Sequence, residues 1–220
     1  MPNDLKKRIL TSVLLLLLFL FFNFTFFFKL GLIVIALLIF LELKNIFKKI
    51  LSKSENTNIK FFILNIIAFI YIFLIFTISS IELHDKTGSS VLFLFIISIC
   101  ILSDIGGYIV GKTVGGKKLT KISPNKTISG TIGSFVFSLI SILLLKNFLS
   151  INLNIGISLV VFVLLVSLVS QIGDLFVSYL KRMARIKDTG SLLPGHGGFL
   201  DRLDGIIFAI PFSYMLIKFI

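Results

Sequence analysis

Residues 155–204 read IGISLVVFVLLVSLVSQIGDLFVSYLKRMARIKDTGSLLPGHGGFLDRLD, an apolar run followed at once by a cluster of charged residues and glycines. The part from Ser178 to Asp204 holds five cations, three carboxylates, one histidine and four glycines. Cations suit phosphate oxygens, carboxylates suit a hard divalent metal, and a glycine-rich backbone lets a ligand approach closely. A plainer interpretation also stands, a solvated loop that is basic because it faces the cytoplasm. The interleaved Asp-Arg-x-Asp and glycines favour a ligand site.

The whole chain is unusually apolar. Its 220 residues are 56% hydrophobic, whereas soluble domains are about 45–50% apolar. Crossing a bilayer takes about 20 apolar residues in a helix. Windows of that size predict seven spans, at about 10–28, 30–43, 61–81, 91–110, 131–149, 155–180 and 204–219. We therefore expect an all-α integral membrane protein, a polytopic helical bundle of about seven transmembrane helices with a polar cavity that faces the cytoplasm.

The positive charges predict the orientation of these spans, because Lys and Arg near helix ends favour the cytoplasmic side. With the N-terminus inside, only Lys29, Lys86, Lys146 and Lys218 of the 22 basic residues lie at outer ends. A multi-pass protein of a bacterial-type cytoplasmic membrane, with its active site facing the cytoplasm, is expected. The net charge of +12 suits membrane lipids and nucleotide phosphates as partners. Nucleic acid is not expected, because the charge lies in loops next to the membrane.

The chain changes character near residue 90. Residues 1–90 are expected to form a scaffold of three spans, the first a retained anchor because it lacks a small-x-small cleavage site. Glu42, close to Lys44, is interpreted as a snorkelling, partly paired carboxylate. Residues 91–220 are expected to form the catalytic domain, with cytoplasmic loops at 111–130 and 181–203.

Polar residues enter the spans from Val91 onward. Asp104, Tyr108 and Gly111 share one helical face, and Asp104 is either functional or the cap of a helix break before Gly106-Gly107. Gly106 to Thr113 fits the pattern GxxxxGK[ST], but that motif binds phosphate after a strand and here follows an apolar span, so we discount it.

A better candidate for binding phosphate follows in the next loop. It consists of the five residues Ser123, Pro124, Asn125, Lys126 and Thr127. The proline fixes a turn, while hydroxyl groups, backbone N–H groups and the lysine charge suit phosphate oxygens.

A polar stripe marks the sixth span. Gln171, Asp174, Ser178, Arg182 and Arg185 recur at helical spacing among apolar residues. The stripe predicts the wall of a water-filled cavity that runs to the cytoplasmic surface, with the neighbouring glycine at 173 loosening the helix. The alternative is a helix pair held by a Gln–Asp hydrogen bond.

Asp201 and Asp204 are expected on one helical face at the start of the last span. With Asp174 they would supply enough oxygen ligands for Mg²⁺ bound together with substrate phosphates. Two histidines and one cysteine, scattered along the chain, disfavour zinc.

The stretch SYLKRMARIKDTGSLLPGHGGFLDRLD resembles a known signature. It matches, at each specified position, the pattern S-x-[LIVMF]-K-R-x4-K-D-x-[GSA]-x2-[LIF]-[PGS]-x-H-G-G-[LIVMF]-x-D-R-[LIVMFT]-D of the phosphatidate cytidylyltransferases, or CDP-diacylglycerol synthases. Two further stretches, Gln171–Leu175 and Ser123–Thr127, are similar to family motifs in the same order. The resemblance covers about residues 100–208. Ser129 stands where the family usually has Glu, which leaves any nucleotide or metal role there open.

The resemblance implies a reaction of CTP with phosphatidic acid that gives CDP-diacylglycerol and pyrophosphate. It implies that Asp174 and Asp201 hold Mg²⁺, with a second cation such as K⁺ left open. Lys181, Arg182, His196 and Asp204 fall within the signature as supporting catalytic residues. The segment Ser123–Thr127 would bind the nucleotide. A homodimer, the acyl-chain preference and CTP against dCTP stay open.

Two other functions, a lipid kinase and a transporter, are compatible with parts of the sequence. A CTP-dependent lipid kinase would transfer the γ-phosphate and would release no pyrophosphate. A transporter would explain Asp104 and Asp174 inside the membrane, but the polar groups gather toward one membrane side and no internal repeat is visible.

Overall fold

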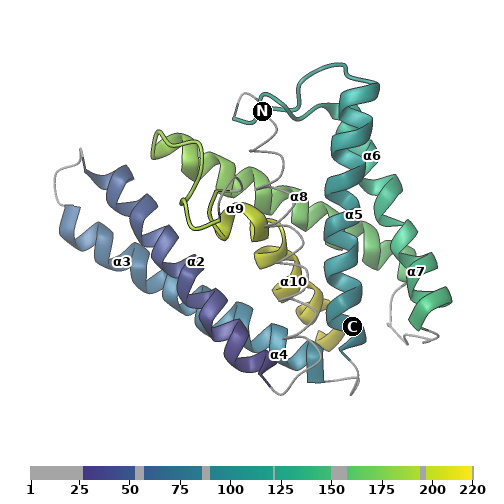
Figure 1. Cartoon of the computed structure of the whole chain (residues 1–220), viewed down its shortest axis with the longest axis horizontal. Coiled ribbons are helices and arrows are strands. Elements are labelled where there is room, and N and C mark those ends of the chain that lie inside the picture. The colour runs from purple at the N-terminus through teal and green to yellow at the C-terminus, as the bar shows by residue number, and fades with distance from the viewer. Residues whose placement is uncertain are drawn as a thin grey trace. The chain divides into compact units, whose positions relative to one another are not determined.

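The computed structural model describes residues 27–52, 57–85, 90–120, 122–149, 158–193 and 197–219 (Figure 1). The regular elements in these ranges are helices, and the only β-structure among the described residues is two isolated bridges, Lys118 with Thr127 and Leu193 with Gly197. The expected all-α class is therefore confirmed. Four helical segments in the described ranges are long and apolar enough to cross a membrane: Phe28–Leu51, Asn58–Asp85, Val91–Thr113 and Leu159–Met183.

The structure supports fewer full-length spans than the seven expected. The predicted span 10–28 lies almost wholly outside the described residues. The predicted span 131–149 is divided at Leu139 into α6 (Ile128–Ser138) and α7 (Ile140–Leu149). The last, α10 (Ile206–Phe219), has 14 residues and contains Pro211. The second span, predicted at about 30–43, is longer than expected, because α2 runs from Phe28 to Leu51.

The chain forms two compact units. The first comprises Met1–Ile81 with Leu180–Leu203, and the second comprises Glu82–Tyr179 with Asp204–Ile220. The expected division at residue 90, between a scaffold and a catalytic part, concerns function and stays a prediction. The first unit does, however, pair the N-terminal helices with the signature loop.

In the first unit, α2 lies beside α3 (Thr57–Phe69), which continues as the π-helix η1 (Ile70–Phe76) into α4 (Thr77–Asp85) (Figure 1). Ala36, Ile39 and Ile46 of α2 are fully buried, at spacings of three and seven residues that place side chains on one helical face. Phe40 packs edge-on against Phe69, with ring centroids 5.8 Å apart. The short helix α9 (Leu200–Leu203) contacts α2.

In the second unit, α5 (Val91–Thr113) crosses α6 at very short range. A Cβ atom on Gly106 would lie 2.5 Å from the carbonyl oxygen of Gly133, and one on Gly107 would lie 2.6 Å from Ser134 Oγ. Such close crossing is typical of small residues in membrane helices. The glycines of the discounted GxxxxGK[ST] pattern therefore lie inside α5 and serve helix packing.

The helix α8 (Leu159–Met183) carries the polar stripe and is continuous. Gly173 does not interrupt it, contrary to expectation. Instead, a Cβ atom at this position would lie 2.6 Å from the ring of Phe208 and 2.9 Å from the carbonyl oxygen of Asp204. The absence of a side chain at Gly173 thus lets α10 and the turn before it approach α8.

Candidate active site

The second unit contains a cavity of about 310 Å³ that gathers most of the polar residues predicted upstream of the signature. Its walls come from α5, the loop 114–127, α6 and α8. The lining includes Asp104, Tyr108, Ser123, Asn125, Lys126, Thr127, Gln171 and Asp174. Only the proline of the predicted nucleotide segment is missing from that lining. Residues separated by up to 70 positions in the sequence therefore share one polar cavity.

Local hydrogen bonds shape the loop that brings Lys126 to this cavity. Leu119 N donates to the Lys126 carbonyl over 2.8 Å, and Ile128 N donates to the Lys117 carbonyl over 3.0 Å. Thr127 then begins α6 as its N-cap, because its hydroxyl accepts from Gly130 N over 3.1 Å. Ser129 Oγ donates to the carbonyl of Gly115. Ser129 thus closes the loop in this chain, at the position where the family usually has Glu.

Lys126 and Asp174 form an ion pair between Nζ and Oδ2. Both side chains are about one-quarter exposed, 29% and 26% respectively, so the pair faces the cavity and is accessible to a ligand. The other carboxylate oxygen of Asp174 accepts from Ser178 Oγ over 3.3 Å. Asp104 lines the same cavity from α5, which favours the functional interpretation of that residue over the helix-break cap, since α5 continues past it to Thr113.

The polar stripe of α8 is partly as predicted. Gln171 and Asp174 line the cavity, and Gln171 Nε2 donates to Ser167 on its own helix over 3.3 Å. Two hydroxyl groups make a polar contact between α5 and α8: Ser103 Oγ of α5 lies 2.9 Å from Ser167 Oγ of α8. The end of the stripe was predicted wrongly. The helix α8 ends at Met183, so Arg185 lies beyond it with φ of 54°.

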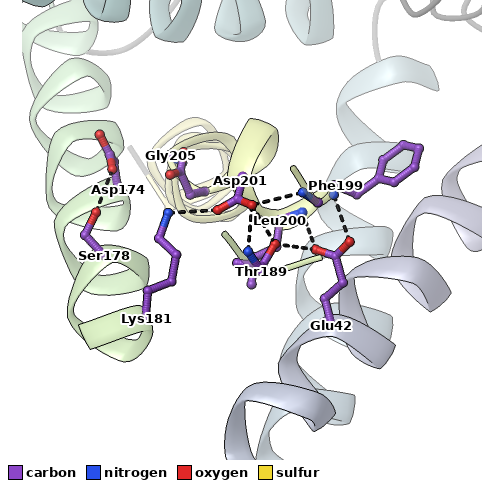
Figure 2. A network of polar contacts seen from close by, with 11 residues as sticks. Glu42, Asp174, Ser178, Lys181, Thr189, Phe199, Leu200, Asp201 and Gly205 are labelled. Carbon is purple, nitrogen blue, oxygen red and sulfur yellow. Dashed lines mark hydrogen bonds and ion pairs between the residues drawn. The ribbon is translucent and has the colours of Figure 1, made fainter. Parts of the chain in front are cut away.

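In the first unit, Asp201 is the centre of a hydrogen-bond network (Figure 2). Lys181 Nζ lies 2.8 Å from Oδ1. The other oxygen, Oδ2, accepts from Thr189 N over 2.7 Å, from Thr189 Oγ1 over 3.0 Å and from Gly198 N over 2.9 Å. Burial by itself would raise the pKa of Asp201, but these hydrogen bonds and the charge of Lys181 together hold its pKa below the usual value. Asp201 is therefore a well-ordered, ionised carboxylate.

Glu42 is the residue that sequence reasoning missed. We expected a snorkelling side chain, but Glu42 is only 4% exposed. It points from α2 toward the signature loop (Figure 2). Its carboxylate accepts from Thr189 Oγ1 over 2.7 Å and from the backbone N–H groups of Phe199 and Leu200, each over 2.9 Å. The available signal was the cost of a carboxylate inside an apolar helix, which is tolerated only with partners.

Two glycines of the signature make room for this carboxylate. A Cβ atom on Gly198 would collide with the carboxylate of Glu42 and the hydroxyl of Thr189. A Cβ atom on Gly190 would lie 2.8 Å from Glu42 Oε1. Gly197 has φ of 86°, a backbone conformation that favours glycine. The glycine-rich turn therefore lets the backbone close around two carboxylates.

The remaining predicted residues fall in different places. Arg182 lies in the last turn of α8 and is exposed. α9 ends at Leu203, so Asp204 does not share a helical face with Asp201 as expected; its Oδ1 accepts from Gly205 N over 2.9 Å, before α10. His196, with Pro194 and Gly195, lies outside the described residues.

The oxygen-rich surroundings of both predicted metal ligands suit a hard cation. Hydroxyl groups and two amides line the cavity with Asp174. Among the described residues, Asp201 Oδ1 is paired with the amine of Lys181. Within the described ranges, no group of three or more His, Cys, Asp or Glu side chains is arranged to hold a metal ion. A cation at Asp174 or Asp201 would therefore need to displace a lysine and to take further oxygens from substrate.

Comparison with known proteins gives one family. The sequence matches the cytidylyltransferase family over residues 4–220. The phosphatidate cytidylyltransferase of Staphylococcus haemolyticus (strain JCSC1435) is 46% identical over 117 residues, which cover 53% of this chain and 45% of that protein. The protein of the same name from Staphylococcus aureus (strain COL) is 46% identical over 125 residues, 56% of this chain and 48% of that protein.

A third relative, the phosphatidate cytidylyltransferase of Staphylococcus epidermidis (strain ATCC 12228 / FDA PCI 1200), is 42% identical over 125 residues. These alignments cover about half the length of the curated relatives. The family match itself extends over nearly all of the sequence, from residue 4 to residue 220. The chain therefore belongs to the cytidylyltransferase family.

Proposed function

We propose that this chain transfers a cytidylyl group from CTP to phosphatidic acid and releases pyrophosphate; its relatives are named phosphatidate cytidylyltransferases. The observation that carries the proposal is the cavity in which Lys126 pairs with Asp174 beside Ser123, Asn125 and Thr127. A cation, a carboxylate and several hydroxyl and amide groups around one cavity suit a nucleotide polyphosphate with its counter-ion.

The reaction requires positioning and charge neutralisation more than covalent help. A phosphate oxygen of phosphatidic acid forms a bond to the α-phosphorus of CTP, and the bond from that phosphorus to the oxygen bridging to the β-phosphate breaks. The electron pair leaves with pyrophosphate. The attacking phosphate is already ionised, so the step needs no general base. His196 is accordingly proposed as a hydrogen-bond donor.

The lysines of the two ion pairs have complementary roles in this proposal. Lys126 pairs with Asp174, and Lys181 pairs with Asp201. When polyphosphate enters, each amine is expected to turn toward phosphate oxygens, joined by Arg182. Each carboxylate is then free to hold a cation. Asp174 and Asp201 would hold Mg²⁺, which would neutralise charge on the CTP phosphates; Asp204 is proposed as a supporting residue.

The protein is proposed to be a multi-pass protein of the cytoplasmic membrane with its active site facing the cytoplasm. The basic loops and the positive-inside tendency support this orientation. The lipid tails of phosphatidic acid would stay in the bilayer while its head group reaches the carboxylates.

The deciding experiment uses the purified protein in lipid–detergent micelles with phosphatidic acid, Mg²⁺ and CTP labelled at the α-phosphorus. We expect label in a CDP-lipid, dependent on phosphatidic acid and accompanied by pyrophosphate. Label that stays in the aqueous phase would contradict the proposal. Transfer from γ-labelled CTP would then identify a lipid kinase, and failure of both nucleotides would favour transport.

The metal assignment has its own test. Asp201→Asn keeps the shape of the side chain but removes its charge, so CDP-diacylglycerol formation should fall strongly and need more Mg²⁺. Asp188→Asn, an exposed carboxylate of the same loop, is the matched control. Near wild-type activity with an unchanged Mg²⁺ dependence in Asp201→Asn would show that the metal lies elsewhere.

A further inference from the structure

A second hollow lies in the first unit, apart from the carboxylates of the proposed reaction. It has a volume of about 790 Å³ and is bounded by the last turns of α2, the end of α8 and the start of the signature loop. Three cations line it: Lys48, Lys49 and Arg185. We call this the basic hollow. Its three cations form no ion pair with a carboxylate among the described residues, which leaves their charge available to an anion.

Arg185 adopts a backbone conformation that is unfavourable for arginine. The end of α8 is a Schellman motif, in which Ile186 N donates to the Lys181 carbonyl over 3.0 Å and Arg185 N donates to the Arg182 carbonyl over 3.1 Å. Such a motif requires a left-handed residue, normally glycine, and Arg185 has φ of 54° there. Helix termination alone does not explain an arginine at this position, whereas a role for its guanidinium in the hollow does.

The hollow lies at the polar end of two helices that are long enough to cross a membrane. The 24 residues of α2 rise by about 36 Å, which exceeds the hydrocarbon thickness of about 30 Å. Lys48 and Lys49, in the last turn of α2, therefore reach the level of the lipid head groups. Cations at that level attract anionic lipids.

The residues that line the basic hollow favour the phosphate of a lipid over that of a nucleotide. None of the described residues around the basic hollow is aromatic, so no ring is available to stack on a nucleotide base. Ile50 and Met183 add apolar surface beside the three cations, which suits the glycerol and upper acyl carbons of a lipid. Asn45 and Ser52 add polar side chains.

We propose that the basic hollow is a binding site for the phosphate-bearing head group of an anionic phospholipid, held by Lys48, Lys49 and Arg185. The site is separate from the bond-forming chemistry, yet it adjoins it. Thr189 lines the hollow with its neighbour Gly190, and the same Thr189 donates its hydroxyl proton to Glu42 and its backbone N–H to Asp201. A bound head group would thus rest against the loop that orders Asp201.

Phosphatidylglycerol is the suitable probe, because it carries a phosphodiester and is not the acceptor in the proposed reaction. The detergent-solubilised full chain is titrated with phosphatidylglycerol or with zwitterionic phosphatidylcholine, and the retained lipid is counted by native mass spectrometry. The variants are Arg185→Gly, Lys48→Ala and the control Lys44→Ala, which removes an exposed charge of α2 outside the hollow. Arg185→Gly should keep the fold, since glycine is preferred at that position.

We expect saturable binding of phosphatidylglycerol in preference to phosphatidylcholine. Arg185→Gly and Lys48→Ala should each weaken it about fivefold, with an unchanged thermal midpoint, and Lys44→Ala should leave it unchanged. The proposed site would be overturned if Lys44→Ala weakened the binding of phosphatidylglycerol equally. It would also be overturned if neither Arg185→Gly nor Lys48→Ala weakened that binding. Displacement of the lipid by millimolar inorganic pyrophosphate would assign the hollow to a free phosphate and overturn the lipid assignment. None of these outcomes depends on turnover of CTP.

Discussion

The hydroxyl group of Thr189 donates to the carboxylate of Glu42 over 2.7 Å and joins two residues that are 147 positions apart in the chain. The same oxygen lies 3.0 Å from Asp201 Oδ2. A hydroxyl group has one proton to donate, so the two carboxylates compete for it. The orientation of Asp201 is thereby linked to a helix that the sequence presents as plain scaffold.

Thr189→Val removes this hydroxyl group and keeps the shape of the side chain. Each hydrogen bond to a charged group contributes about 1.5–3 kcal/mol, so the variant should unfold several degrees earlier and should have a lower kcat. Thr189→Ser keeps the hydroxyl group and should retain most activity. Thermal unfolding in detergent and the CTP assay measure both effects. Wild-type values in Thr189→Val would show that the shared hydroxyl group is unimportant.

Glu42→Ala should be more damaging than Thr189→Val, because it leaves two backbone donors without their acceptor and removes one of the two acceptors of the Thr189 hydroxyl group. The two donors are the backbone N–H groups of Leu200, the first residue of α9, and of Phe199, just before it. We expect a loss of about 3–5 kcal/mol in stability together with weaker binding of Mg²⁺. Glu82→Ala, which removes an exposed glutamate of α4, is the matched control. Equal stability of the two variants would contradict a positioning role for Glu42.

The lowered pKa of Asp201 predicts a specific response to acid. A carboxyl group whose folded pKa is depressed stabilises the fold above its unfolded pKa of about 3.9, and that contribution is lost as pH falls through the folded value. Lys181 is a main cause of the depression, through a hydrogen bond and its charge. In Lys181→Met, burial opposes ionisation with less compensation, so stability should begin to fall at higher pH than in the wild type.

Thermal midpoints measured from pH 3 to pH 8 test this response. The control is Lys187→Met, which removes an exposed cation of the same loop. Coincident pH profiles for Lys181→Met and the wild type, after normalisation to pH 8, would mean that Lys181 does not set the pKa of Asp201. An equal shift of the pH profile in Lys187→Met would attribute the effect to the net charge of the protein.

Lys126→Ala should raise the CTP KM by about tenfold or more, since a charge-assisted contact to phosphate contributes about 1.5–3 kcal/mol. Lys117→Ala, in the same loop but outside the cavity, should leave the KM unchanged. Steady-state kinetics with saturating phosphatidic acid separate KM from kcat. An unaltered CTP KM in Lys126→Ala would place the nucleotide away from this cavity.

Gly106→Ala should disrupt the crossing of α5 and α6. The added methyl group would lie 2.5 Å from the Gly133 carbonyl oxygen, so the two helices must move apart. Because both helices line the cavity of Asp104 and Asp174, we expect a lower thermal midpoint and lower activity together. Ile132→Ala, on the exposed face of α6, should change neither strongly. A Gly106→Ala variant with the wild-type thermal midpoint and activity would show that the crossing of α5 and α6 can accommodate a methyl group.

Local residue types and spacing were enough to predict an all-α class and to select the residues of the candidate site. Apolar runs predicted membrane helices because a backbone in hydrocarbon must satisfy its own hydrogen bonds. The Ser178–Asp204 signature and the segment Ser123–Thr127 identified polar groups that the structure then placed around two carboxylates, Asp174 and Asp201. Those assignments depend on local residue types and spacing, which a sequence shows directly.

The partners of those groups depend on tertiary contacts between segments far apart in the chain. Glu42 was interpreted as a snorkelling carboxylate because its hydrogen-bond donors lie about 150 residues later in the chain. No periodic pattern in the sequence indicates a contact at that separation. The end of α8 at Met183, which turns Arg185 out of the polar stripe, was likewise not visible in the sequence, because the left-handed position that normally holds glycine is occupied by Arg185. The glycines at 106, 190 and 198 explain the difference most simply: the sequence shows that a side chain is missing, and packing shows which neighbour requires the space.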